Sequence, residues 1–274
     1  MSTTRKLWMV AVLIAVGLLA SVGLSWPTRT ATVGGFSLVV SGKELLGLIM
    51  VGLASTGTEA MMRSHPKAQT DQVRLSFLQW LRPSALVSAS WALLTRLDGI
   101  PAQIACVLAT VAALLLLILT EYYVLDPSAP WCAAAQFFLQ LAAYPLATLL
   151  YIAIDLSQLA SPVAGIAVAV VSATLGLTLL HDPVRRLRRT LPYVLGLGTL
   201  LGALSCLLDL WIASPARATD ARTPLIHALA LVVPLYVLAG VIQHQLSGRL
   251  TRKVAIEYLV VGIVALLLLL SFTR

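Results

Sequence analysis

Ionisable side chains within long apolar stretches are the residues of this sequence that could carry chemistry. A charged side chain at the centre of a bilayer costs about 2.5–3.5 kcal/mol on insertion scales, so each such residue needs a reason to be there. Five of them are expected at a similar depth near one face of the membrane: Glu59, Arg63, Arg82, Glu121 and Glu257. They could form an ion or proton site or a binding mouth, with Glu59 or Glu121 neutralising Arg82. The favoured alternative is a one-turn Glu59–Arg63 pair, with the other side chains reaching the headgroups.

A second set of polar residues is expected near the opposite face. Asp155 ends one apolar segment, while Asp209 and His227 each lie about one turn inside others. Asp209 could pair with His227 across neighbouring helices or serve as a proton carrier, although simple interfacial placement explains both residues as well. Haem ligation is not indicated, because His227 and His244 fall near opposite ends of one expected helix.

Familiar catalytic and metal-binding motifs are absent from the sequence. There is no GxxxxGK[ST], HExxH, GxSxG or GxGxxG motif. The three cysteines, Cys106, Cys132 and Cys206, show no CxxC or Cys/His spacing and are interpreted as small packing residues. The sequence therefore indicates no metal site and no cofactor, and it favours a protein that is not an enzyme.

Composition places the chain in a membrane. Of its 274 residues, 59% are hydrophobic and only 11% are charged, whereas a soluble domain is about 25% charged. The formal net charge is +8, but most basic residues fall in short connections beside apolar runs. They are better explained by membrane topology and anionic lipid headgroups than by nucleic acid. We predict one integral-membrane domain over residues 1–274, with the lipid bilayer and other membrane-protein subunits as partners.

Nine apolar segments predict a helical transmembrane bundle, because each is long enough to cross about 30 Å of hydrocarbon. Seven or eight helices remain possible. The first segment could be a signal peptide, but its long apolar run favours a retained helix. Residues Thr28–Val40 could be an extended or re-entrant stretch. The expected segments are 7–25, 44–62, 76–95, 101–121, 131–155, 162–180, 191–213, 225–246 and 254–272.

The distribution of basic residues predicts the orientation. Four arginines lie between the sixth and seventh segments: Arg185, Arg186, Arg188 and Arg189. With nine helices and the N-terminus inside, twelve Lys and Arg residues fall on the cytoplasmic side and six outside, Arg82 being left out. Basic connections tend to stay in the cytoplasm, so we expect a multi-pass inner-membrane protein with its C-terminus outside. The four arginines are interpreted as a topological anchor beside anionic lipid.

Residues that disturb or tighten helices mark the interior of several segments. Pro83, Pro145 and Pro234 are expected to kink or loosen their helices locally. The pair Gly198 and Gly202, spaced as GxxxG, allows two helices to approach closely, either within the chain or against a partner.

Several residues together resemble a known family. The stretch Gly57-Thr-Glu-Ala-Met-Met-Arg-Ser-His-Pro66, Pro83, and Thr120-Glu-Tyr122 followed by Asp126 resemble a small bacterial integral-membrane family of unknown function, mainly over residues 45–127. The resemblance implies a polytopic inner-membrane protein and carries over no activity and no catalytic residue.

Three functions are compatible with these features. The leading hypothesis is a structural or accessory subunit, because the connections are short and intramembrane charges are few. The alternative is a transporter or channel for a small solute or ion that uses the first polar cluster. A membrane enzyme acting on a lipid-linked substrate is the third, and fold alone cannot decide among them.

Overall fold

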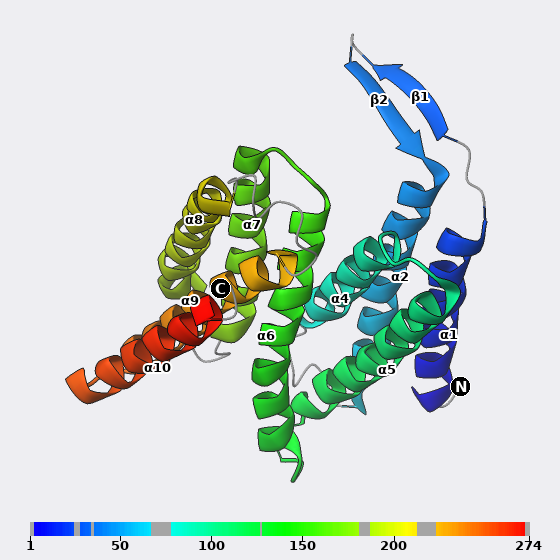
Figure 1. Cartoon of the computed structure of the whole chain (residues 1–274). Helices are drawn as coiled ribbons and strands as arrows, with labels where there is room; N and C mark the ends of the chain where they lie inside the picture. The colour runs from blue at the N-terminus through cyan, green and yellow to red at the C-terminus, as the bar shows by residue number, and fades with distance from the viewer. Residues whose placement is uncertain are drawn as a thin grey trace. The chain divides into compact units, whose positions relative to one another are not determined.

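The secondary structure agrees with the predicted helical bundle. A computed structural model describes residues 3–24, 28–33, 36–66, 78–126, 128–180, 187–212 and 223–271. Within these ranges nine helices coincide with the nine apolar segments (Figure 1). They are α1 (Thr3–Gly23), α2 (Gly42–Arg63), α4 (Leu78–Leu94), α5 (Ile100–Val124), α6 (Cys132–Leu156), α7 (Ser161–Leu180), α8 (Leu187–Ile212), α9 (Thr223–Leu246) and α10 (Arg252–Ser271).

Length and composition of the helices identify a polytopic membrane protein. On the described residues, six helices are long and apolar enough to cross a membrane: α2, α5, α6, α7, α8 and α9. The apolar part of α1 and the whole of α4 are shorter, at 17 residues each. A membrane core requires about 20 apolar residues per helix, so the six long helices alone define a multi-pass bundle.

The segment that the sequence left as extended or re-entrant forms a β-hairpin. Strand β1 (Thr28–Val33) pairs antiparallel with β2 (Phe36–Ser41), and the register runs from Thr28 opposite Ser41 to Val33 opposite Phe36. Ser41 ends β2 and also caps α2, because its hydroxyl accepts from the Glu44 amide while the Glu44 carboxylate accepts from the Ser41 amide. This capping box fixes where the hairpin ends and α2 begins.

The chain divides into two compact units, residues Met1–Leu141 and Ala142–Arg274, with the boundary inside α6. In the first unit, α1 buries Ile14 and Leu18 completely. Glycines let neighbouring helices approach: the backbone of Gly17 lies against the Met50 side chain, and that of Gly47 lies against the Trp91 ring.

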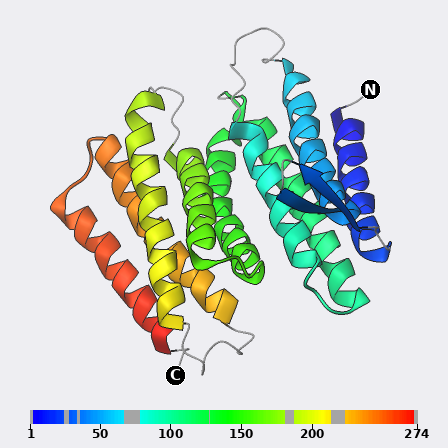
Figure 2. The same ribbon diagram turned by 90° about the horizontal axis from the view of Figure 1, so that it is seen from above.

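The second unit is centred on the contact between α7 and α8, whose antiparallel course is visible in Figure 2. Gly165 and Gly202 face each other so closely that a β-carbon on Gly202 would lie 2.5 Å from the Gly165 carbonyl oxygen. Gly198 meets the Ala169 carbonyl in the same way. The predicted GxxxG approach is therefore an internal contact between two helices of this chain.

We predict that Gly202→Ala destabilises the second unit. The new methyl group would meet the Gly165 carbonyl oxygen at 2.5 Å and the Ala169 side chain at 2.8 Å, and overpacking of this kind costs about 1–3 kcal/mol. Thermal unfolding in detergent, followed by circular dichroism, measures the loss.

Gly196→Ala provides the matched control on the same helix, because nothing lies within 4 Å of the position that its β-carbon would take. This variant should be neutral or slightly stabilising, since alanine favours helix over glycine. Equal melting temperatures for the two variants would contradict the close α7–α8 contact.

Candidate functional site

Arg82 and Glu121 form a buried ion pair in the first unit. Arg82 lies in the second turn of α4 and Glu121 in the last turn of α5, and Arg82 Nη1 donates to Glu121 Oε1 at 2.5 Å. The side chains are 10% and 4% exposed. In the low-dielectric interior either charge alone would be strongly unfavourable, so each residue makes the other tolerable. The sequence offered Glu59 or Glu121 as the partner of Arg82, and in the structure the partner is Glu121.

The other members of the first predicted cluster do not join this pair as a group. Glu59 and Arg63 form their own one-turn ion pair at 2.6 Å on α2, with side chains 44% and 70% exposed. Glu257 is exposed on α10 and belongs to the second unit. Four of the five residues therefore form two ion pairs within the first unit, and Glu257 belongs to the second unit.

Part of the arginine cluster belongs to a helix rather than to a connection. Arg188 and Arg189 lie in the first turn of α8, which begins at Leu187. The predicted segment began at 191, whereas Pro192 lies in the second turn of the helix, where it removes one intrahelical hydrogen bond. Arg185 and Arg186 fall outside the described residues.

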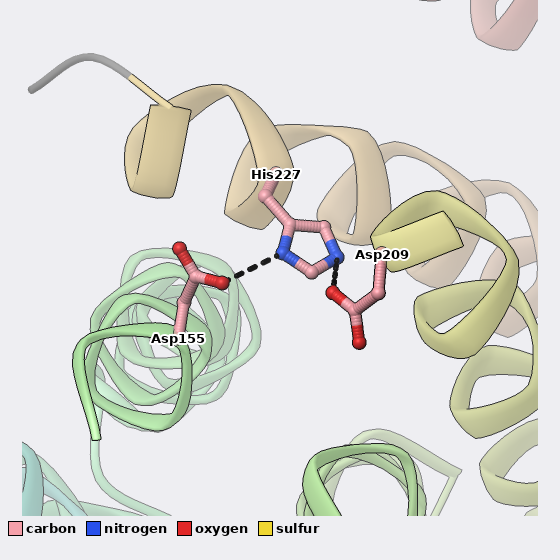
Figure 3. A group of neighbouring side chains, drawn as sticks. All are labelled: Asp155, Asp209 and His227. Atoms are coloured by element: carbon pink, nitrogen blue, oxygen red, sulfur yellow. Dashed lines mark hydrogen bonds and ion pairs between the residues drawn. The ribbon is translucent and has the colours of Figure 1, made fainter. Parts of the chain in front are cut away.

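A second polar cluster lies in the second unit, where three helices place two carboxylates on either side of one imidazole (Figure 3). Asp155 is in the last turn of α6, Asp209 in the last turn of α8 and His227 in the first turns of α9. His227 Nδ1 lies 3.1 Å from Asp155 Oδ1, and His227 Nε2 lies 3.8 Å from Asp209 Oδ1. Ser161, the first residue of α7, donates its hydroxyl to Asp209 Oδ2 at 2.8 Å.

Burial and hydrogen bonding differ within this Asp–His–Asp cluster. His227 is only 6% exposed, whereas the two aspartate side chains are 25–26% exposed. Among the described residues, His227 Nε2 is buried and has no hydrogen-bond partner. A histidine can act as a general base, a proton carrier or a metal ligand through such a nitrogen.

Sequence reasoning paired Asp209 with His227 as one possibility but missed the roles of Asp155 and Ser161. The alternating direction of successive membrane helices was a signal that could have found them. The ends of α6 and α8 and the starts of α7 and α9 must share one face if successive helices run in opposite directions. Polar residues at those four ends were therefore candidates for a single cluster.

The architecture defines a multi-pass helical membrane protein, and comparison with known sequences places it in a family. The chain matches the family described as a protein of unknown function (DUF5656) over residues 26–272, and it belongs to that family. The match covers far more of the chain than the stretch that carried the predicted resemblance. No curated protein and no solved structure matches the chain.

We predict that Arg82→Ala lowers stability much more than Arg63→Ala. Loss of Arg82 leaves the Glu121 carboxylate buried without its cation, which costs about 3–5 kcal/mol. Loss of Arg63 removes an exposed pair on one helix, worth at most about 0.5 kcal/mol. Unfolding in mixed micelles of increasing denaturing-detergent content measures both free energies.

A double variant separates the lost pair from lost packing. Arg82→Met combined with Glu121→Met removes both charges and keeps apolar volume, so it should recover most of the stability. Equal destabilisation by Arg82→Ala and Arg63→Ala would show that the buried pair contributes no more to the free energy of unfolding than the exposed pair does.

Proposed function

We propose that the chain is a structural or accessory subunit that packs against other membrane proteins. The observation that carries the proposal is the Arg82–Glu121 pair. Two charged side chains this deeply buried and bonded to each other hold α4 and α5 together. The bond between them joins two helices of the chain, and such a bond suits a scaffold better than a substrate site.

Other buried polar groups support the same proposal. Ser55 on α2 and Ser84 on α4 share a hydrogen bond of 2.7 Å between their hydroxyls. Tyr151 on α6 and Ser172 on α7 share a hydrogen bond of 2.8 Å between their hydroxyls. Interhelical hydrogen bonds and small residues are what hold helices together in lipid.

Helix α10 offers an apolar surface for a partner helix. Among the described elements it packs chiefly against α9, where the Gly240 backbone lies against the Tyr258 ring. Beyond the charged residues of its first two turns, its remaining surface is apolar and at least half exposed at several positions, among them Leu259, Val260, Leu267 and Leu268. We propose that an apolar transmembrane helix of another subunit packs on this face.

We predict that a photoreactive residue at Leu267, in place of leucine, gives a discrete protein adduct in native membranes. Leu267 is 61% exposed on α10, and Val170 on α7 is 60% exposed. The Val170 position therefore serves as the matched control and should label lipid only. Denaturing gels and mass spectrometry of the adduct provide the measurement, and identical patterns from both positions would refute a partner helix on α10.

We further propose that the chain lies in the cell membrane, with its N-terminus in the cytoplasm and its C-terminus outside the cell membrane. The support is the two-to-one excess of basic residues on the cytoplasmic side. In this orientation Arg185, Arg186, Arg188 and Arg189 lie beside the anionic lipid headgroups of the inner leaflet.

Single cysteines test the orientation in a chain whose three native cysteines are replaced by alanine. Val184→Cys should react with a membrane-impermeant maleimide only after the cells are permeabilised. Ser157→Cys, which lies across α7 in an exposed turn, should react in intact cells. The reverse pattern would invert the proposed orientation.

Ion transport is a second candidate function, and the Asp–His–Asp cluster is the observation that favours it. Ionisable residues within transmembrane helices commonly mark ion and proton pathways. The cluster lies at the ends of its helices, so it could serve as the entrance to such a pathway. Flux of an ion into vesicles that contain the protein is the property that separates this candidate from an accessory subunit.

A further inference from the structure

We propose that Asp155, Asp209 and His227 form a binding site for a divalent transition-metal ion such as Zn²⁺. The ligand-capable atoms of the three residues all lie within 4.8 Å of one another. They come from three helices, α6, α8 and α9, whose ends meet at one face of the second unit (Figure 3).

Asp155 prepares His227 to act as a ligand. At 3.1 Å, the Asp155 carboxylate accepts a hydrogen bond from the Nδ1–H of His227. This assigns the proton to Nδ1 and leaves the lone pair on Nε2, directed toward Asp209. A carboxylate that holds the far nitrogen of a metal-binding histidine is a common outer partner, and it raises the basicity of the ligand nitrogen.

Asp209 supplies the second ligand. Ser161 donates to Asp209 Oδ2, and the other carboxylate oxygen, Oδ1, lies toward the imidazole. The hydroxyl therefore holds the carboxylate in an orientation in which one oxygen is bonded to the protein and the other faces His227 Nε2.

The distance between the two proposed ligand atoms suits a shared ion better than a direct hydrogen bond. His227 Nε2 and Asp209 Oδ1 are 3.8 Å apart, which is too long for a hydrogen bond. Two atoms bound to one zinc ion at about 2.0–2.1 Å lie roughly 3.3 Å apart at the tetrahedral angle. A side-chain movement of about half an ångström would bring both atoms into coordination.

Burial supplies an independent reason to expect a ligand. His227 is 6% exposed, and its Nε2 has no hydrogen-bond partner among the described residues. A buried polar atom without a partner is unfavourable, because it has lost its bond to water. Coordination of a cation would satisfy Nε2 and also offset the negative charge of the two carboxylates.

The ligand types select the class of ion. Imidazole nitrogen suits Zn²⁺ and related transition metals, whereas Mg²⁺ and Ca²⁺ prefer an all-oxygen shell. With the His227 nitrogen and the Asp209 carboxylate as ligands, the site leaves coordination positions for water or for a ligand from outside. The aspartates are about one quarter exposed, so an ion can reach the site from the aqueous face.

Zinc titration of the purified full-length chain tests the proposal. The protein carries an affinity tag other than polyhistidine, is stripped with a chelator and is titrated in detergent by calorimetry. We expect one saturable Zn²⁺ ion per chain. His227→Gln and Asp209→Asn should each weaken binding at least tenfold, and Asp155→Asn should weaken it about 10–100-fold through loss of the outer partner.

His244→Gln is the matched control, because His244 lies at the other end of α9 and contacts the Tyr258 ring instead. It should bind Zn²⁺ as the native chain does. Cobalt provides a second readout: the visible absorption of bound Co²⁺ should change in Asp155→Asn, whereas a merely structural effect would lower the amount bound without changing the spectrum of the bound ion.

Several outcomes would overturn the proposal. These are the absence of saturable Zn²⁺ binding by the folded native chain, unchanged affinity in His227→Gln, or equal loss of affinity in His244→Gln. Imidazole resonances of His227 that do not shift on addition of Zn²⁺ would also refute a metal site. If His227→Gln does not fold, Asp209→Asn carries the same test. Binding does not depend on transport or on a partner subunit, so its failure is distinguishable from failure of either proposed function.

Discussion

The hydrocarbon interior of a bilayer offers no hydrogen-bond partners, and this constraint governs where polar groups occur in the chain. Backbone groups are satisfied by helices, and buried side chains must find partners inside the protein. Arg82 finds Glu121 on the next helix, and the Ser172 hydroxyl is bonded both to Tyr151 and to the Val168 carbonyl of its own helix. The described β-hairpin pairs its two strands with each other and passes directly into α2 through the Ser41 cap.

Close backbone approach follows from the same constraint, because lipid gives no hydrophobic drive for one helix to bind another. Helix association in lipid must then come from van der Waals contact, which requires small residues where the helices meet. Gly165, Gly198 and Gly202 place α7 and α8 in near-backbone contact. This contact positions the start of α7 beside the end of α8, so Ser161 reaches Asp209. Packing in the middle of the helices thereby determines the geometry of the polar cluster at their ends.

Sequence reasoning predicted the helices well, because a run of about 20 apolar residues has few alternatives to a membrane helix. It did not resolve which acid pairs with Arg82, since contact between helices depends on their rotation and neighbours, which hydropathy does not encode. It placed Asp155 near the same face as Asp209 and His227 but gave it no partner, because residues distant in the sequence meet only through the arrangement of helix ends. The start of α8 was misplaced for a local reason: the helix begins at Leu187, but the apolar run begins only after Arg188 and Arg189. A functional role for the five charged residues of the first cluster, or for the Asp–His–Asp cluster, stays a prediction.

The two buried polar sites differ in their charge balance, and this difference separates their proposed roles. In the Arg82–Glu121 pair one cation meets one anion, so the two charges cancel. In the second cluster two carboxylates face one imidazole, so a neutral histidine leaves two negative charges and an unpaired Nε2. Protonation of the histidine would cancel only one of these charges, whereas a divalent cation would cancel both while bonding to Nε2. A balanced pair stabilises the contact between two helices, but an unbalanced cluster with a free nitrogen has the capacity to bind a ligand.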